Sequence, residues 1–486
     1  MTTDDVLTEL RALQAGDLPT HGGATMAYVY DSGRAEIEEI AAAAQAAFQW
    51  TNALDPTAFP SVARIENDLV GAAVALLGGD AATVGTLTSG GTESCLLAVL
   101  AARERWRSRS GSPAAPGRPR LLLPVTAHAA FRKAAHLFDL EVVDVPVDPE
   151  TCRAVPSAVA GLLDDRTALV VVSAPSYPHG VLDPVGEVAA LAAAARVPCH
   201  VDACIGGWIL PFLDDVPEPF DLSVPGVTSL SVDLHKYGYA PKGVSVLLTA
   251  DPELRQDHWF ATAGWPGYPV VNPTLAGTRP AGAMAAAWAV HRWLGTDGYG
   301  ELARQAHDAT RALATGIDAI GGLRVVGDPV STLVAVAQDG PYGVDVLNLA
   351  DEMTARGWLL QPQPPFAQDG GHMPATLHLT VTGATAGRVD ALLADLAEAA
   401  VSAAALPRPV ADADLVAAAA TIDPAALTVA EVDALLELAG VGGGRLPERM
   451  ASVHALVAAL PRPVAERLLA GVLDLVYRPS REAAIG

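Results

Sequence analysis

The feature that most constrains the fold is an alternation of sequence character between residues 61 and 250. Ala- and Leu-rich stretches that favour helices are separated there by short runs rich in β-branched residues. Alternation of this kind predicts a mostly parallel sheet covered by helices on both faces. In such folds, ligands bind beyond the carboxyl ends of the strands. We expect strands at 121–125, 141–147, 168–173, 198–202, 229–232 and 244–248.

The rest of the chain predicts further units around this α/β domain, because 486 residues are enough for two or three of them. Short apolar runs after residue 310 predict a smaller α+β unit with strands at 323–326, 332–337, 358–361 and 376–382. Ala-rich stretches punctuated by proline predict helices beyond it. We therefore divide the chain into an N-terminal arm (1–60), a large domain (61–310), a small C-terminal domain (311–400) and a helical C-terminal extension (401–486).

Charge and composition disfavour several classes of partner. A net charge of −24 disfavours nucleic acid and anionic membranes. No apolar run approaches the roughly 20 residues of a membrane-spanning helix, and the acidic start of the chain does not resemble a signal peptide. The four cysteines form no CxxC pair. We expect a cytoplasmic protein with reduced thiols, no metal site, no membrane span and no nucleic-acid partner.

Lysine is scarce in this chain, with three residues against 28 arginines (31 basic residues minus three lysines). Lysine can lose its proton and attack a carbonyl, whereas arginine stays protonated. Lys236 follows a hydrophobic run and lies beside His235 in the sequence. This position favours a Schiff-base lysine that holds pyridoxal 5′-phosphate (PLP). The ordinary alternative is that a GC-rich genome exchanged Lys for Arg and left three lysines by chance.

A glycine-containing loop precedes a strongly helical stretch at 95–106. It contains Ser89, Gly90, Gly91 and Thr92. Glycines let the backbone approach a ligand closely, and free N–H groups at a helix start attract anions. The loop therefore predicts a phosphate site, although an ordinary glycine-rich helix start would have the same sequence.

Two further polar side chains directly follow predicted strands. His128, after the strand at 121–125, is placed to stack on a cofactor ring, or else to cap a helix or sit in a loop. Asp202 ends an apolar run, where a buried carboxylate needs a partner. The protonated ring nitrogen of PLP is such a partner. A helix N-cap is the alternative for this aspartate.

The motifs of the chain, taken in order, resemble those of PLP-dependent group II decarboxylase-like enzymes of fold type I, most closely the sphingosine-1-phosphate lyases. The resemblance extends over residues 27–477. It implies an α/β large domain with a mostly parallel seven-stranded sheet, a smaller C-terminal α+β domain and an N-terminal arm. The motifs that carry it are TSGGTES, TAHAAFRKAAH, SYPHGVLDPVGEVA, HVDACIGGW, SVDLHKYGYAPKG and NPTLAGTRP.

The resemblance also implies roles for individual residues. Lys236, Asp202 and His128 take the roles of the Schiff-base lysine, the partner of the ring nitrogen and the stacking residue. The residues that it implies for holding the cofactor are Ser89, Gly90, Gly91, Thr92, His128, Asp202, His235, Lys236 and Thr274. Tyr30 and Lys242 are implied as catalytic groups. The substrate-binding residues that it implies are Tyr30, Asn52, Lys242 and Arg279.

These roles predict a carbon–carbon lyase. Its reaction would be retro-aldol cleavage of a phosphorylated amino alcohol to an aldehyde and an aminoethyl phosphate. PLP-dependent decarboxylation of an amino acid is the alternative, because the same electron sink serves both reactions. An aminotransferase is less consistent with the motifs, and a non-catalytic scaffold would not need the Lys236, Asp202 and His128 set. The family implies a homodimer with active sites at the subunit interface and a small-molecule amine or amino acid as substrate.

Overall fold

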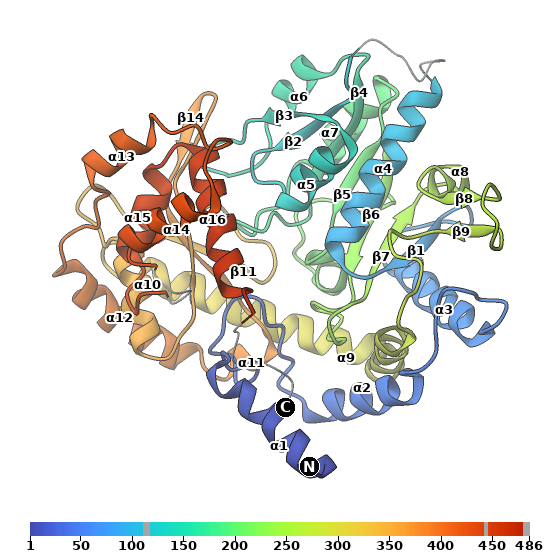
Figure 1. Cartoon of the computed structure of the whole chain (residues 1–486), viewed down its shortest axis with the longest axis horizontal. Coiled ribbons are helices and arrows are strands. Elements are labelled where there is room, and N and C mark those ends of the chain that lie inside the picture. Colours follow the sequence, from blue (N-terminus) through green and yellow to red (C-terminus); the bar gives the residue numbers. More distant parts are fainter. Residues whose placement is uncertain (110–116, 442–445, 480–486) are drawn as a thin grey trace.

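A computed structural model describes residues 1–109, 117–441 and 446–479 (Figure 1). Its centre is a seven-stranded sheet of order β1-β7-β6-β5-β4-β2-β3. The strand β7 runs antiparallel to both of its neighbours, β1 and β6, and all other pairs in this sheet are parallel, so the mostly parallel sheet expected from the sequence is confirmed. The strands are β1 (Val84–Thr88), β2 (Arg120–Pro124), β3 (Glu141–Val145), β4 (Thr167–Ser173), β5 (Cys199–Asp202), β6 (Val227–Asp233) and β7 (Ser245–Thr249).

Helices cover both faces of this sheet, and successive residues of β2 show how. Leu121 and Leu123 pack into one core with Phe131, beneath helices α4 (Gly91–Arg109) and α5 (Ala129–Phe138). Leu122 points to the opposite face and packs into a second core, to which the helices α3, α7 and α9 also contribute residues. Side chains alternate across a strand, so a strand buried on both faces is a continuous apolar run. The bounds of these helices and of the shorter α6 are α3 (Pro60–Leu76), α6 (Pro156–Leu162), α7 (Val185–Ala194) and α9 (Ala281–Asp318).

A second, antiparallel sheet has the order β10-β11-β15-β12 and packs against the helices α10 and α12 and the last turns of α9. The strand expected at 358–361 begins only at Gln361. Trp358 and Leu360 are buried core residues, so the apolar run reflects packing rather than pairing in the sheet. The elements of this unit are β10 (Leu323–Val325), β11 (Leu333–Gln338), α10 (Val346–Ala355), β12 (Gln361–Gln363), β13 (Phe366–Gln368), β14 (Gly371–Met373), β15 (Thr376–Thr380), α11 (Gly383–Ala386) and α12 (Val389–Ala404).

The C-terminal helices dock on the second sheet's unit through α10. The Asp351 carboxylate of α10 accepts hydrogen bonds from the backbone N–H groups of Met450 (2.8 Å) and Ala451 (3.2 Å), and so caps the start of α15. The predicted boundary at residue 310 falls inside the 38-residue α9, and the division into domains stays a prediction. These C-terminal helices are α13 (Ala413–Ala419), α14 (Val429–Leu438), α15 (Ala451–Ala459) and α16 (Arg462–Val476).

The remaining elements lie before β1 and between β5 and α9. A two-stranded hairpin follows the large sheet, and no strand was predicted there. Among the helices that the structure describes, none combines the length and the apolar character needed to span a bilayer. These elements are α1 (Thr3–Leu13), η1 (Gln14–Gly16), α2 (Ala35–Phe48), η2 (Gly206–Trp208), η3 (Leu210–Phe212), α8 (Pro252–Gln256), β8 (Phe260–Thr262) and β9 (Val270–Asn272).

Candidate active site

A pocket of about 350 Å³ opens where the parallel strands β4, β5 and β6 end. Each of these strands contributes its last residue to the lining: Ser173, Asp202 and Asp233. The pocket therefore lies at the carboxyl edge of the sheet, where α/β folds bind ligands. Eight residues singled out in the sequence line it, namely Ser89, Gly90, Gly91, Thr92, His128, Asp202, His235 and Lys236.

Asp202 is fixed by one of its two carboxylate oxygens. Its Oδ1 accepts a hydrogen bond from the backbone N–H of Cys204 (3.1 Å) and lies 3.4 Å from Ser231 Oγ. Behind it, Ser231 Oγ is 3.2 Å from Nε2 of the fully buried His200. Burial lowers the pKa of His200 to about 4, so this imidazole is neutral and forms a rigid polar support. Among the described residues, no hydrogen bond reaches Asp202 Oδ2.

Lys236 forms an ion pair with a carboxylate that the sequence analysis did not identify. Its Nζ lies 2.9 Å from Oδ2 of Asp233, the last residue of β6, which is almost fully buried. Burial alone would lower the pKa of Lys236, but the Asp233 charge outweighs this effect and raises it. Burial likewise favours the protonated form of Asp233, yet the Lys236 charge leaves its pKa below the ordinary value. Without a cofactor, the pair is therefore charged.

His128 takes one of the two roles that the sequence left open, since it caps a helix, and its role in stacking on a cofactor ring stays a prediction. Its Nδ1 accepts a hydrogen bond from the Ala130 N–H (3.2 Å) at the start of α5, while its ring lines the pocket. The ring also meets that of Tyr177 edge to face, with centroids 6.5 Å apart. Burial lowers the pKa of His128, and the charge of Lys236 acts in the same direction. A neutral ring held by its Nδ1 hydrogen bond suits stacking on a flat ligand.

The glycine loop sits against the Asp233 and Cys204 side chains. A Cβ on Gly91 would lie 2.7 Å from both carboxylate oxygens of Asp233 and 2.9 Å from Cys204 Sγ, so only glycine fits without displacement. Gly91 begins α4, whose first N–H groups have no partner within the helix. The buried Glu93 carboxylate accepts the Ser89 N–H (2.6 Å) and fixes the loop.

Tyr30 and Lys242 lie next to the pocket without lining it. The Lys242 Nζ is 4.7 Å from the centre of the Tyr30 ring and donates to the His235 carbonyl (3.2 Å). Partial burial and the charge of Lys236 lower the pKa of Lys242 to about 8, although part of its side chain reaches solvent. Burial raises the pKa of Tyr30, so its phenol stays protonated at neutral pH.

Three predicted residues are not brought into the pocket within one chain. Asn52 Oδ1 accepts the backbone N–H of Leu54 (3.0 Å), and Thr274 Oγ1 donates to a nearby carbonyl. Arg279 pairs with Glu66 (3.1 Å) in a separate cavity of about 330 Å³. The contacts that the resemblance implies for these residues stay predictions.

Sequence reasoning missed several lining residues. Asp233 ends a strand three residues before Lys236, and an acid at that position was a usable signal. Tyr177 lies in the quoted motif SYPHGVLDPVGEVA, but its stacking on His378 and its hydrogen bond to Gln361 (2.6 Å) depend on the second sheet. Cys95 follows the glycine loop by three residues, so its place in the lining was also a usable signal, whereas its approach to Cys204 depends on tertiary packing.

Comparison with known families covers most of the chain. Residues 40–337 match the pyridoxal-dependent decarboxylase conserved domain. Residues 413–475 match the C-terminal HTH domain described for pyridoxal-dependent enzymes.

Individual relatives agree with these matches. A sphingosine-1-phosphate lyase of Dictyostelium discoideum is 36% identical over 81% of this chain and 71% of its own length. The rat sphingosine-1-phosphate lyase 1 is 36% identical over 74% of this chain and 62% of its own length. The solved structure of a Burkholderia pseudomallei sphingosine-1-phosphate lyase is 37% identical, with a TM-score of 0.76 over 83% of this chain and 91% of that one. A Lactobacillus brevis glutamate decarboxylase shares the fold at 22% identity, with a TM-score of 0.73 over 84% of this chain and 94% of that one.

The pocket residues fit the PLP that this family uses. The start of α4 offers N–H donors for a phosphate, and Gly91 leaves the space that a side chain would fill. Asp202 has one oxygen fixed by the backbone and the other available for a protonated ring nitrogen. Lys236 supplies the chain's amine within the same pocket. The fold, the cofactor and the enzyme class expected from the motifs are thus confirmed, and the chain belongs to the pyridoxal-dependent decarboxylase family as a PLP-dependent lyase related to the sphingosine-1-phosphate lyases.

Proposed function

We propose that this enzyme cleaves a phosphorylated amino alcohol by a retro-aldol reaction, releasing an aldehyde and an aminoethyl phosphate. Sphingosine-1-phosphate lyases from several organisms are 32–37% identical to this chain, which supports this substrate class. The observation that carries the proposal is the convergence of Lys236, Asp202 and His128 with the glycine loop in one pocket at the carboxyl edge of the sheet.

The predicted site residues that line the pocket have proposed tasks in holding the cofactor. The loop Ser89–Thr92 and His235 hold the phosphate, His128 covers the ring, and Asp202 keeps the ring nitrogen protonated. Lys236 carries the cofactor and receives protons during turnover. When bound, PLP withdraws electrons from the substrate carbon next to the amine. The Asp233 carboxylate, 2.9 Å from the Lys236 amine, stabilises that amine whenever it is free and protonated.

The substrate hydroxyl must give up its proton as the carbon–carbon bond breaks. Lys242 and Tyr30 are the two candidates for the base. With a pKa near 8, Lys242 is partly neutral at physiological pH and can accept this proton. Tyr30 has a raised pKa and is better suited to donate a hydrogen bond. We propose that Lys242 is the base and that Tyr30 orients it through the contact between amine and ring.

The experiment that separates this reaction from amino acid decarboxylation is an end-product assay. The PLP-loaded protein is incubated with phosphorylated long-chain bases and, separately, with amino acids. Aldehyde and aminoethyl phosphate should accumulate from the former, in equal amounts, and no CO₂ from the latter. Release of CO₂ without any aldehyde would refute the proposed reaction. The Lys236→Ala variant is the control for background chemistry.

We also propose that the HTH-like module does not bind nucleic acid. Residues 413–475 carry eight acidic residues, four arginines and no lysine, a net charge of −4. Binding to phosphates requires the opposite sign. The described arginines of this module are engaged within the chain: Arg449 with Glu352, Arg462 with the ring of Phe366, and Arg467 with the Leu427 carbonyl.

A cytoplasmic homodimer is the assembly that we propose. All four cysteines are free, which suits a reducing compartment. The β8–β9 hairpin exposes large apolar side chains, including Phe260, Trp265 and Tyr268, as a subunit interface would. The neighbouring segment with Thr274 and Arg279 would then meet the partner's site. Equilibrium sedimentation tests this assembly, and a monomer at micromolar concentration would refute it.

A further inference from the structure

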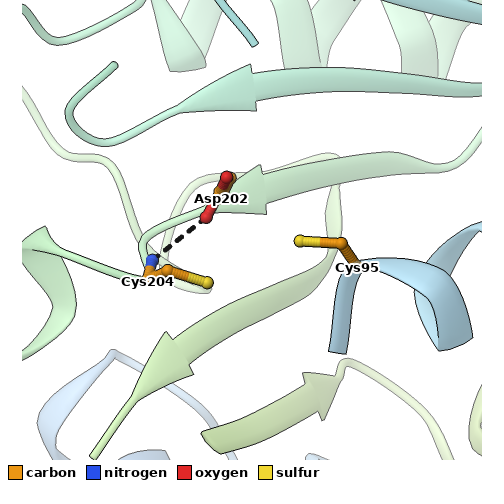
Figure 2. A group of neighbouring side chains, drawn as sticks. All are labelled: Cys95, Asp202 and Cys204. Carbon is orange, nitrogen blue, oxygen red and sulfur yellow. Dashed lines mark hydrogen bonds between the residues drawn. The ribbon is translucent and has the colours of Figure 1, made fainter. Parts of the chain in front are cut away.

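Two cysteines and the cofactor-pairing aspartate form a compact cluster in the lining of the pocket. Cys95 lies in the first turns of α4, Asp202 ends β5, and Cys204 follows two residues later. The two sulfur atoms point toward one another beside the Asp202 carboxylate (Figure 2). One ligand atom from each residue lies within 4.8 Å of the others, and all three residues are buried. All three also line the pocket, so the cluster can be reached by a small solute.

This set of donor atoms suits a soft divalent cation. Two thiolates and a carboxylate are ligands that Zn²⁺ and Cd²⁺ accept in a tetrahedral arrangement, with the fourth position left for water. The cluster also has an outer support of the kind that holds metal ligands in place. Ser231 Oγ lies 3.3 Å from Cys204 Sγ and 3.4 Å from Asp202 Oδ1. The other two cysteines of the chain, Cys152 and Cys199, are buried outside this cluster.

We propose that the cofactor-free protein binds one Zn²⁺ or Cd²⁺ ion through Cys95, Asp202 and Cys204, and that this ion and PLP exclude each other. On coordination, each thiol releases its proton to solvent as its sulfur binds the metal. Exclusion follows because Asp202 serves either the metal or the ring nitrogen. This second part rests on the proposed role of Asp202 in cofactor binding, whereas the metal site itself does not.

The test titrates cofactor-free protein with Cd²⁺ and follows the thiolate-to-cadmium charge-transfer absorption, with metal content measured after dialysis. We expect one Cd²⁺ per chain. Cys95→Ala should weaken Cd²⁺ binding on the order of 100-fold or more, since loss of outer-shell partners alone costs about 10- to 100-fold. Cys152→Ala is the matched control and should bind as the wild type does. Near-ultraviolet circular dichroism checks that each variant is folded, and Cys95→Ser gives a second, smaller perturbation.

Three results would overturn the metal site: no absorption band, unchanged affinity in both Cys95 variants, or equal loss in Cys152→Ala. Exclusion is tested by adding Cd²⁺ to PLP-loaded protein. We expect the apparent Cd²⁺ affinity to fall in proportion to PLP occupancy. Full occupancy by both ligands at once would refute exclusion. Failure of PLP to load in the absence of metal would instead count against the proposed function, so the two failures are distinguishable.

Discussion

Substitution of Gly91 by alanine gives a sharp test of how the pocket is built. The added methyl group would lie 2.7 Å from both Asp233 oxygens and 2.9 Å from Cys204 Sγ. Asp233 cannot retreat freely, because it is buried and paired with the Lys236 amine at 2.9 Å. Overpacking of this kind costs about 1–3 kcal/mol. We therefore expect Gly91→Ala to disturb both the phosphate loop and the position of Lys236.

The effect should appear as weaker cofactor binding. If this overpacking energy destabilises only the PLP-bound protein, PLP affinity decreases by about 5- to 150-fold. The assay is equilibrium titration of cofactor-free protein with PLP, followed by tryptophan fluorescence and by absorption. Gly186→Ala is the matched control, since Gly186 is the second residue of α7 and its added Cβ meets no atom within 4 Å. Its PLP affinity should be unchanged.

The result that would refute this reasoning is a Gly91→Ala variant that binds PLP within about twofold of the wild type, a difference of only about 0.4 kcal/mol. The glycine loop and the Asp233 side chain would then be able to move apart more easily than their contacts indicate. An equal loss in Gly186→Ala would also contradict it, because the effect would not be specific to the pocket.

Further predictions concern the polar residues around the pocket. Asp233→Asn removes the charge that raises the pKa of Lys236. Reductive methylation of the Lys236 amine in cofactor-free protein should therefore reach its midpoint at a lower pH than in the wild type. An unchanged midpoint would show that Asp233 does not control the charge of this amine. If Lys242 is the base, kcat/KM should rise with pH through about 8 as the amine loses its proton, and Lys242→Arg should remove this rise at every pH. A rise that persists in Lys242→Arg would exclude that role. Ser231→Ala leaves Nε2 of His200 without its partner and should lower the free energy of unfolding by about 1–3 kcal/mol, measured by denaturant titration. Unchanged stability would show that His200 needs no such partner.

The fold could be read from the sequence where burial shapes the residue pattern. β4 is buried at every position, and its largely apolar or β-branched run was recognised. The strand β1 was not, because Val84–Thr88 contains a glycine and two threonines and leads directly into the glycine loop. The Trp358 region shows the opposite error, an apolar run that packs in the core before the strand begins.

The candidate site was predictable only in part. Strand ends identified Asp202, His128 and Lys236, because the geometry of a parallel sheet places such residues on one edge. The Lys236–Asp233 pair is local, because Asp233 ends β6 three residues before Lys236, and the sequence contained that signal. The approach of Cys95 to Cys204 depends instead on how α4 packs over the large sheet. That packing joins residues more than 100 positions apart, and neither spacing nor composition encodes it.

The most direct test of the central claim is to locate the covalent attachment of PLP. The loaded protein is reduced with borohydride, digested and analysed by peptide mass spectrometry. The three lysines of the chain make the assignment unambiguous. We expect a phosphopyridoxyl group on Lys236 and none on Lys133 or Lys242. Labelling of either of the other two lysines, with Lys236 unmodified, would contradict it.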